Sequence, residues 1–308
     1  MSIATTTARA SMAAVEAGHR SLASERSRDR NPRSLIFLGL LWFSLFFGVM
    51  VLVVLIVNTA IEGAPRFDAN LFNRYESTIM PERTGFRAGI LGSLWLMVFT
   101  GLFSVPLGIA AALYLEEFAD RHRWYNRFIE VNLQNLAAVP SVIYGLLAVA
   151  VMAVLGFNYK AIVLGGSIAL ALLILPVIII TTREAVRAVP RDIRAGSLAL
   201  GATVWQTTWR QTLPSAIPGI ATGTILGLSR AIGEAAPLVL LGIASVRFDP
   251  TGLTDAVTAL PIQIYRMSSN SQEAVQIAAS AGIIVLLVMI LLMNALAIII
   301  RNKFQRTW

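Results

Sequence analysis

Long apolar segments recur along this chain of 308 residues, and they constrain its fold more than any other feature. The first extends from Leu35 to Asn58. A helix needs about 20 predominantly apolar residues to cross the hydrocarbon core of a bilayer. With 56% hydrophobic residues, 14% charged residues and a mean hydropathy of +0.70, the chain is far more apolar than a soluble domain of this size requires. The sequence therefore predicts an all-α, polytopic membrane protein.

Six membrane-spanning helices are predicted from the apolar segments and the polar stretches between them. They cover residues 35–58, 88–115, 131–155, 161–182, 215–245 and 277–300. The last five form a core over residues 88–300. Residues 59–87 and 246–276 are predicted to lie on the extracytoplasmic side, and the second of these segments is expected to hold a short re-entrant or surface helix near Leu260–Met267.

The distribution of basic residues predicts the orientation. With both termini in the cytoplasm, the inner segments hold more than twice as many Lys and Arg residues as the outer ones, as the positive-inside rule requires. Residues 1–34 are polar and rich in Arg, and we expect a disordered cytoplasmic tail. Residues 301–308 form the cytoplasmic C-terminus. A charged turn is expected at 116–130 and a tight outer turn at 156–160.

The composition excludes several classes of site. There is no cysteine, and the two histidines, His19 and His122, lie outside the predicted spans, so no metal site and no catalytic residue is expected. The two lysines, Lys160 and Lys303, do not follow a Gly-x-x-x-x-Gly pattern, so this chain is not expected to bind or hydrolyse ATP. The net charge of +8 is attributed to arginine-rich cytoplasmic loops of a protein in lipid, and not to nucleic-acid binding.

Prolines and small residues interrupt the predicted spans. Each of spans two to five carries at least one proline, which opens backbone hydrogen bonds that lipid cannot satisfy. These helices are therefore expected to pack in a bundle or to line a wet cavity. The small residues suit close helix contact, and helix packing alone can explain any one of them. They are Gly89, Gly92, Ser93, Gly165, Gly166, Ser167, Gly219, Gly223 and Gly227.

The polar loop 183–214 between spans four and five predicts a helix–glycine–helix hairpin. Pro190 can begin the first short helix, and Ile193–Leu200 is helix-like. Gly201 interrupts it, and Val204–Leu213 forms a second short helix that is expected to end at Pro214. Such a hairpin can transmit force to a soluble partner. An ordinary cytoplasmic connector is the alternative.

This loop resembles the cytoplasmic coupling loop of importer-type ABC transporter permeases. Gly201, Leu213 and Pro214 match the family pattern in register, whereas Ala195, Gly196 and Ser197 occupy the usual Glu-Ala-Ala positions, and Gln211 replaces the usual Ile. The resemblance implies that this loop docks on a separate ATPase. The residues expected to take part are Ile193, Ala195, Gly196, Ser197, Leu198, Leu200, Gly201, Val204, Trp209, Leu213 and Pro214.

Two charged residues lie within predicted span five. A charge inside the bilayer costs about 2.5–3.5 kcal/mol on insertion scales, so Arg230 and Glu234 are candidates for function. On one helix, residues four apart share a face, and a self-neutralised structural ion pair is one interpretation. The other is an anion path in which Arg230 binds an oxyanion and Glu234 tunes it. Ser229 can donate a further hydrogen bond, although membrane serines often bond only their own helix.

Several segments are similar to the PstA-type permeases of bacterial phosphate importers. They are VPLGIAAALYLEEFA (105–119), NLAAVPSVIYGL (135–146), ALGATVWQ (199–206), LSRAIGEAAP (228–237) and PIQIY (261–265). The resemblance implies a type I ABC importer permease fold in the bacterial inner membrane. It also implies a phosphate path shared with a PstC-type sister permease. The other implied partners are a PstB-type ATPase dimer, which uses the ATP, and an extracytoplasmic PstS-type phosphate-binding protein.

Other functions remain open at this point. Against an ABC permease for sulfate or molybdate stand only the segments above and, to a lesser degree, the acidic Glu234, to which a protonated phosphate oxygen can donate. A proton-driven secondary transporter with Glu234 as proton carrier does not predict the helix–glycine–helix loop, and no inverted repeat is visible. An intramembrane enzyme is disfavoured, because there is no His-Glu-x-x-His motif and no membrane histidine to activate a serine.

Overall fold

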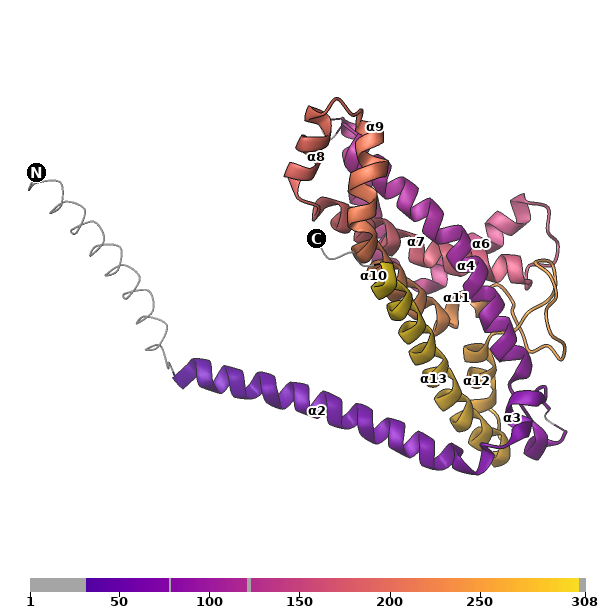
Figure 1. The fold of residues 1–308 in the computed structure, drawn as a ribbon. Helices are drawn as coiled ribbons and strands as arrows, with labels where there is room; N and C mark the ends of the chain where they lie inside the picture. Colours follow the sequence, from indigo (N-terminus) through magenta and orange to yellow (C-terminus); the bar gives the residue numbers. More distant parts are fainter. Residues whose placement is uncertain (1–31, 78, 121–122, 305–308) are drawn as a thin grey trace, which may run out of the picture. The chain divides into compact units, whose positions relative to one another are not determined.

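The computed structural model describes residues 32–77, 79–120 and 123–304, and every named element in these ranges is a helix (Figure 1). A single antiparallel bridge, Ile162 to Ala256, is the one strand-like pairing among them. Nearly all of the predicted N-terminal tail lies outside the described residues. The same holds for Arg121, His122 and the last four residues of the chain.

In the part of the chain that the structure describes, four helices are long and apolar enough to cross a membrane. They are α2 (Pro32–Gly63), α4 (Arg87–Leu113), α7 (Val163–Arg187) and α13 (Glu273–Phe304). They coincide with predicted spans one, two, four and six, and they confirm a helical membrane protein. A fifth crossing arises if two helices that meet at a bend are counted together. The count of six spans and the cytoplasmic location of both termini stay predictions.

Helix α2 carries an apolar surface along most of its length. Every side chain from Ser34 to Asn58 is exposed, including Trp42, Phe43 and Phe46. Residues up to Asn58 form a unit of their own, apart from the compact unit that begins at Thr59. Exposing so large a surface of Phe, Leu and Val side chains to water is unfavourable, so the composition of α2 fits a helix that faces lipid.

Helix α7 is the central helix of the compact unit. It packs most extensively on α4 and α10 (Leu213–Ile232), and Leu170, Ile174 and Ile178 are almost fully buried on it. Glycines allow this close approach: a Cβ on Gly223 of α10 would lie 2.1 Å from Thr181 Oγ1 of α7. The predicted role of small residues in helix packing is confirmed at this contact.

Replacing Gly92 of α4 with alanine is expected to destabilise the protein. A Cβ there would lie 2.0 Å from the backbone oxygen of Thr258 and 2.9 Å from Val257 Cγ2, and a backbone atom cannot rotate away. Overpacking of this kind costs about 1–3 kcal/mol. The thermal midpoint in detergent should therefore fall for Gly92→Ala. It should not fall for Gly39→Ala, because no atom lies within 4 Å of a Cβ there. Equal midpoints would contradict the close contact.

The predicted span at 131–155 is not one continuous helix. The chain forms two helices there, α5 (Trp124–Ala137) and α6 (Ser141–Val154), which meet at an angle of 114°. Pro140 lies at the bend, where proline disfavours helical geometry in the residue before it. The expected charged turn at 116–130 is also shorter than predicted, because α5 begins at Trp124.

The predicted span at 215–245 is not one continuous helix either. Helix α10 ends at Ile232, and a separate short helix, α11 (Ala236–Leu240), follows after a turn. Pro237 lies in the first turn of α11, where its missing N–H is not needed, so the chain restarts a helix there. Helix α10 is less apolar than α2, α4, α7 and α13, because it contains Pro214, Pro218, Arg230 and several Gly and Thr residues. It is therefore not one of the four helices that are apolar enough to cross a membrane.

The predicted hairpin is present, with one correction. Helix α8 (Arg191–Ala199) is followed by Gly201 and then by α9 (Val204–Thr207), as expected. The second arm does not end at Pro214, however. A wide π-helical turn, η4 (Thr208–Thr212), joins α9 directly to α10, and the chain passes Pro214 as a helix (Figure 1). We call α8, α9 and η4 the α8–α9 hairpin.

The polar segments 59–87 and 246–276 contain short helices. They are η1 (Ala64–Arg66), α3 (Ala69–Asn73), η2 (Pro81–Arg83) and α12 (Leu260–Ser268), and α12 confirms the short helix predicted near Leu260–Met267. The two segments are joined by an ion pair of 2.6 Å between Arg87 Nη2 and Asp249 Oδ2.

Hydrogen bonds from the hydroxyl and backbone N–H of Thr251 hold the pKa of the Asp255 carboxyl below its usual value.

Candidate functional site

A glycine-dependent turn joins the two arms of the α8–α9 hairpin. Gly201 has φ +84°, a left-handed conformation that side-chain-bearing residues rarely adopt. The N–H of Gly201 donates to the carbonyl of Leu198, and the N–H of Ala202 donates to that of Ser197. These bonds close the end of α8 as a Schellman motif, which satisfies carbonyls that have no partner within the helix. The angle between the arms therefore depends on the backbone freedom of Gly201.

Side-chain hydrogen bonds fix the second arm against the first. Thr203 caps α9 in a capping box: its hydroxyl accepts from the N–H of Gln206, whose side chain accepts from the N–H of Thr203. The hydroxyls of Ser197 and Thr207 are 2.9 Å apart and link α8 to α9. The two arms are thus joined by a side-chain hydrogen bond as well as by the turn at Gly201.

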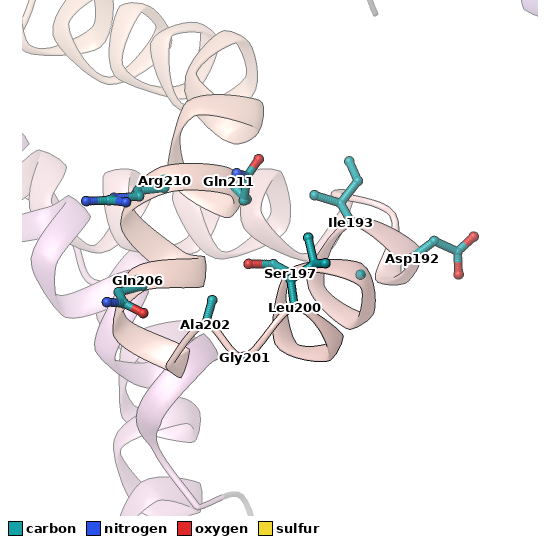
Figure 2. A pocket seen from close by; sticks show the side chains of 10 residues that line it. Asp192, Ile193, Ser197, Leu200, Gly201, Ala202, Gln206, Arg210 and Gln211 are labelled. Atoms are coloured by element: carbon teal, nitrogen blue, oxygen red, sulfur yellow. The ribbon is translucent and has the colours of Figure 1, made fainter.

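A cavity of about 560 Å³ opens between the two arms. Figure 2 shows side chains of both arms around it, with Gly201 at the turn. The lining residues are Asp192, Ile193, Gly196, Ser197, Leu200, Gly201, Ala202, Gln206, Arg210 and Gln211. Five of the predicted coupling residues therefore line one cavity: Ile193, Gly196, Ser197, Leu200 and Gly201.

The hairpin presents apolar side chains that the compact unit does not cover. Leu200 is 91% exposed, and Leu198, Val204 and Trp209 are exposed as well. Trp205 belongs to the same surface and is 60% exposed, although the sequence analysis did not single it out. Its aromatic neighbour at Trp209, four residues later in the chain, was the signal that could have identified it.

Other predicted coupling residues differ in exposure. Ala195, Gly196 and Pro214 are exposed and Ser197 is half-buried. Ile193 and Leu213 are also half-buried and pack on a cluster around Val186 and Ile220. Ile193 and Leu213 therefore pack the hairpin against α7 and α10, whereas the exposed residues are available to a partner.

Three arginines of the loop are bound in ion pairs with the end of α4. Arg183 and Arg187 of α7 reach Glu116 Oε2, at 3.4 and 3.0 Å, and Arg194 of α8 reaches Glu117 Oε1 at 2.9 Å. Both carboxylates are buried, with side-chain exposures of 3% and 10%. The positive charge of the loop is therefore largely neutralised within the chain.

The two membrane charges do not share a helix. Arg230 lies in the last turn of α10 and is exposed, whereas Glu234 lies beyond Ile232, the last residue of that helix. The prediction that both residues occupy one helix face is therefore wrong. Among the residues that the structure describes, no ion pair joins them. The guanidinium of Arg230 lies within electrostatic range of Tyr144 on α6.

Ser229 faces the last helix. Its hydroxyl donates to the carbonyl of Ile225, 2.6 Å away on its own helix, and also contacts Asn294 Oδ1 of α13. A second polar contact lies two turns away, where Arg301 Nη1 donates to Thr222 Oγ1 at 3.1 Å. These contacts fix the rotation of α10 about its axis and hence the side on which Arg230 emerges. The sequence analysis missed Asn294, although an amide in an apolar span is a recognisable signal.

Comparison with known proteins identifies the family of the chain. The family described as "Binding-protein-dependent transport system inner membrane component" matches residues 104–306. This range includes the hairpin, Arg230 and Glu234. The chain belongs to this family. The permease is therefore an inner-membrane subunit of an ABC importer. Its relatives are transport subunits and not enzymes, so ATP hydrolysis falls to a partner.

Individual relatives extend over most of the permease. It is 29% identical over 274 residues to a protein of Yersinia pestis named "Phosphate transport system permease protein PstA", which covers 89% of this chain and 92% of that protein. A PstA protein of Xylella fastidiosa is 30% identical over 249 residues. This alignment covers 80% of the permease and 85% of that protein. A chain of a bacterial alginate ABC transporter shares the fold, with a TM-score of 0.66 and 18% identity over 89% of the permease and 96% of that chain.

The predictions of the type I ABC importer permease fold and of the inner membrane as location are confirmed by these similarities. The residues that the structure describes contain no group of three or more His, Cys, Asp or Glu side chains suited to a metal ion. The candidate functional residues lie in two regions of the chain. One is the hairpin, and the other is the polar end of α10.

Proposed function

We propose that the permease forms half of an ATP-driven inorganic phosphate path. Its partners are a PstC-type sister permease, a PstB-type ATPase dimer and a PstS-type phosphate-binding protein outside the membrane. Support comes from the relatives named as PstA phosphate permeases, which cover most of the chain. In this proposal the substrate path passes Arg230, Glu234 and Ser229, and the hairpin couples it to the ATPase.

The exposed Arg230 is the observation that carries the proposal. A guanidinium in a membrane helix without a carboxylate partner among the described residues can bind an oxyanion through two parallel hydrogen bonds. Glu234, held nearby in the turn after α10, would select among oxyanions. A protonated phosphate oxygen can donate to a carboxylate, whereas fully ionised sulfate cannot. Ser229 would act through Asn294 by keeping α10 in the rotation that exposes Arg230 to the path.

Uptake in vesicles tests the substrate and the energy source together. The permease would be reconstituted with its sister permease, the ATPase and the binding protein, and labelled phosphate uptake measured with and without ATP. We expect uptake to require ATP and to resist competition by sulfate and molybdate. Competition by either anion would change the assigned substrate. Uptake that persists without ATP but collapses with the proton gradient would overturn the proposal and make Glu234 a proton carrier.

The hairpin is suited to dock on the ATPase. Its two arms are joined by a side-chain hydrogen bond, it presents exposed Leu, Val and Trp side chains, and its arms enclose a cavity that a partner side chain can enter. Closure of the ATPase dimer on ATP would move the hairpin and so alternate the path between inward-open and outward-open states. ATP must bind the two states with different affinity for this to occur.

Replacing Leu200 with aspartate is expected to prevent the ATPase from binding. Leu200 is 91% exposed, so the change leaves the permease fold intact but places a charge in an apolar contact. A central apolar contact of this kind lowers affinity by about 30-fold when lost. Co-purification of the ATPase with the permease measures the effect. The control, Ile79→Asp, alters another highly exposed apolar residue, in the segment 59–87, and should leave co-purification unchanged. Equal ATPase recovery from both variants would contradict docking at Leu200.

A further inference from the structure

The turn that ends α4 contacts three successive elements of the coupling region. Helix α4 passes into a π-helical turn, η3 (Tyr114–Phe118). Within this turn Glu116 pairs with Arg183 and Arg187 of α7, and Glu117 pairs with Arg194 of α8. The next residue, Phe118, packs against Trp205 of α9 with the ring centroids 5.9 Å apart. Three consecutive side chains thus hold α7, α8 and α9.

The turn is itself firmly anchored in the compact unit. Leu115 is buried in a cluster with Ala112, Leu133 and Ile179, which come from α4, α5 and α7. Glu130 of α5 completes the ionic group, because its Oε1 lies 2.9 Å from Arg183 Nη2. A π-helical turn is wider than an α-helical one and often occurs at functional sites. Here it lets neighbouring side chains reach partners in different directions.

Arg194 joins three elements through one guanidinium group. Its Nη2 donates to the carbonyl of Val186 on α7 at 2.6 Å and lies 2.9 Å from Glu117 Oε1. The contact with Glu117 is an ion pair by distance and not an aligned hydrogen bond. Both side chains are largely buried, at 24% and 10% exposure, so their attraction is less screened by water than that of a surface pair. Removing one partner of a largely buried pair is therefore expected to weaken the link between η3 and α8.

Helix α4 is not connected directly to the hairpin in the chain. The chain connects the hairpin directly to α7 on one side and to α10 on the other, whereas α4 is separated from it by α5, α6 and α7. Non-covalent contacts therefore give the shortest path by which a movement of the hairpin reaches the end of α4. Among the described residues, the Glu117–Arg194 ion pair links η3 to α8.

We propose that η3 is a mechanical link that makes α4 move with the hairpin, and that Glu117 and Arg194 are its positioning residues. The inference rests on the proposed coupling of the hairpin to an ATPase. When the hairpin moves, the ion pair and the Phe118–Trp205 contact carry the displacement to α4. Without the pair, α4 stays behind, and ATP is hydrolysed with little transport.

Charge reversal tests the link. Glu117→Arg and Arg194→Glu are each expected to lower phosphate transported per ATP hydrolysed by about tenfold, a size typical of coupling between sites. Assembly of the complex and its ATPase activity should remain. The matched control for Arg194→Glu is Arg127→Glu, which makes the same change of charge at an exposed position of α5 and should keep the wild-type ratio. An unchanged ratio in both reversal variants would overturn the proposal.

Restoring the connection by other means separates a mechanical role from a merely structural one. The double variant Glu117→Arg/Arg194→Glu re-forms the pair with exchanged charges and should recover most of the coupling. The chain has no cysteine, so Glu117→Cys/Arg194→Cys provides a unique pair for a short bifunctional thiol reagent. This variant should be uncoupled before cross-linking and coupled after it.

Failure of the cross-link to restore coupling in an assembled complex would overturn the mechanical role. Should the reversal variants fail to assemble, the cysteine pair decides the matter, because it introduces no charge. The wild-type complex distinguishes this proposal from the function on which it rests. Absence of ATP-dependent uptake in wild type would refute the importer function, whereas normal wild-type uptake with fully coupled variants would refute only the link.

Discussion

Replacing Arg230 with alanine is expected to abolish phosphate uptake and to leave the assembled complex intact. A hydrogen bond to a charged group contributes about 1.5–3 kcal/mol, so the loss of a bidentate guanidinium should lower uptake by about 100-fold or more. The permease itself should tolerate the change. Arg230 is exposed and has no ion-pair partner among the described residues, so no buried carboxylate loses its counter-charge. ATP-dependent uptake and recovery of all subunits would be measured on the same preparation.

The variant Arg230→Lys refines the test. Lysine keeps the positive charge but lacks the planar pair of donors, so intermediate uptake is expected. Equal loss in both variants would indicate that two-point binding is essential, and full activity in Arg230→Lys would indicate that the charge alone suffices. Normal uptake by Arg230→Ala would remove Arg230 from the substrate path.

Replacing Gly201 with leucine is expected to separate ATP hydrolysis from transport, or to prevent the ATPase from binding. The cause is conformational. No atom lies within 4 Å of a Cβ at this position, but φ is +84°, and a left-handed conformation costs a side-chain-bearing residue about 1–2 kcal/mol. The turn can avoid this cost by changing its angle, and that moves α8 relative to α9. ATPase co-purification and phosphate transported per ATP are the measurements.

Two controls isolate the role of the turn. Asparagine tolerates the left-handed conformation better than other side chains, so Gly201→Asn should retain much of the coupling. Gly156 ends α6 with φ +83° and also has open space around a Cβ. Gly156→Leu therefore introduces the same strain outside the hairpin, and it should leave coupling unchanged. If Gly201→Leu remains assembled and coupled, the proposed role of the hairpin is wrong.

The hairpin shows which local features can be read from a sequence. The first arm and its end were predicted within two residues, because α8 is bounded by Pro190 and Gly201, whose backbone preferences are intrinsic. The second arm was predicted to end at Pro214 and does not. The π-helical turn at Thr208–Thr212 widens the helix just before the proline, and no local residue pattern in this segment predicts such a turn.

The candidate site was predicted only in part, for a similar reason. Arg230 and Glu234 stand out because charges are rare in an apolar segment. Their relation was misjudged, because the spacing of four residues implies one face only if the helix continues. It ends at Ile232. Asn294 and Trp205 each leave a local signal in the sequence, but their contacts could not be predicted from it, because their partners Ser229 and Phe118 lie far away in the chain.

The sequence by itself determined the class of the protein, the positions of its long helices and the glycine at the hairpin turn. Hydrophobic length, proline and glycine act within a few residues of their own position, so they require no knowledge of the rest of the chain. Only the tertiary structure decided the angle of 114° between α5 and α6, the contact of Ser229 with Asn294 and the contacts of η3 with α7, α8 and α9. Those features depend on contacts between distant segments, such as Arg187 with Glu116 across 71 residues, and such contacts exist only once the helices have packed.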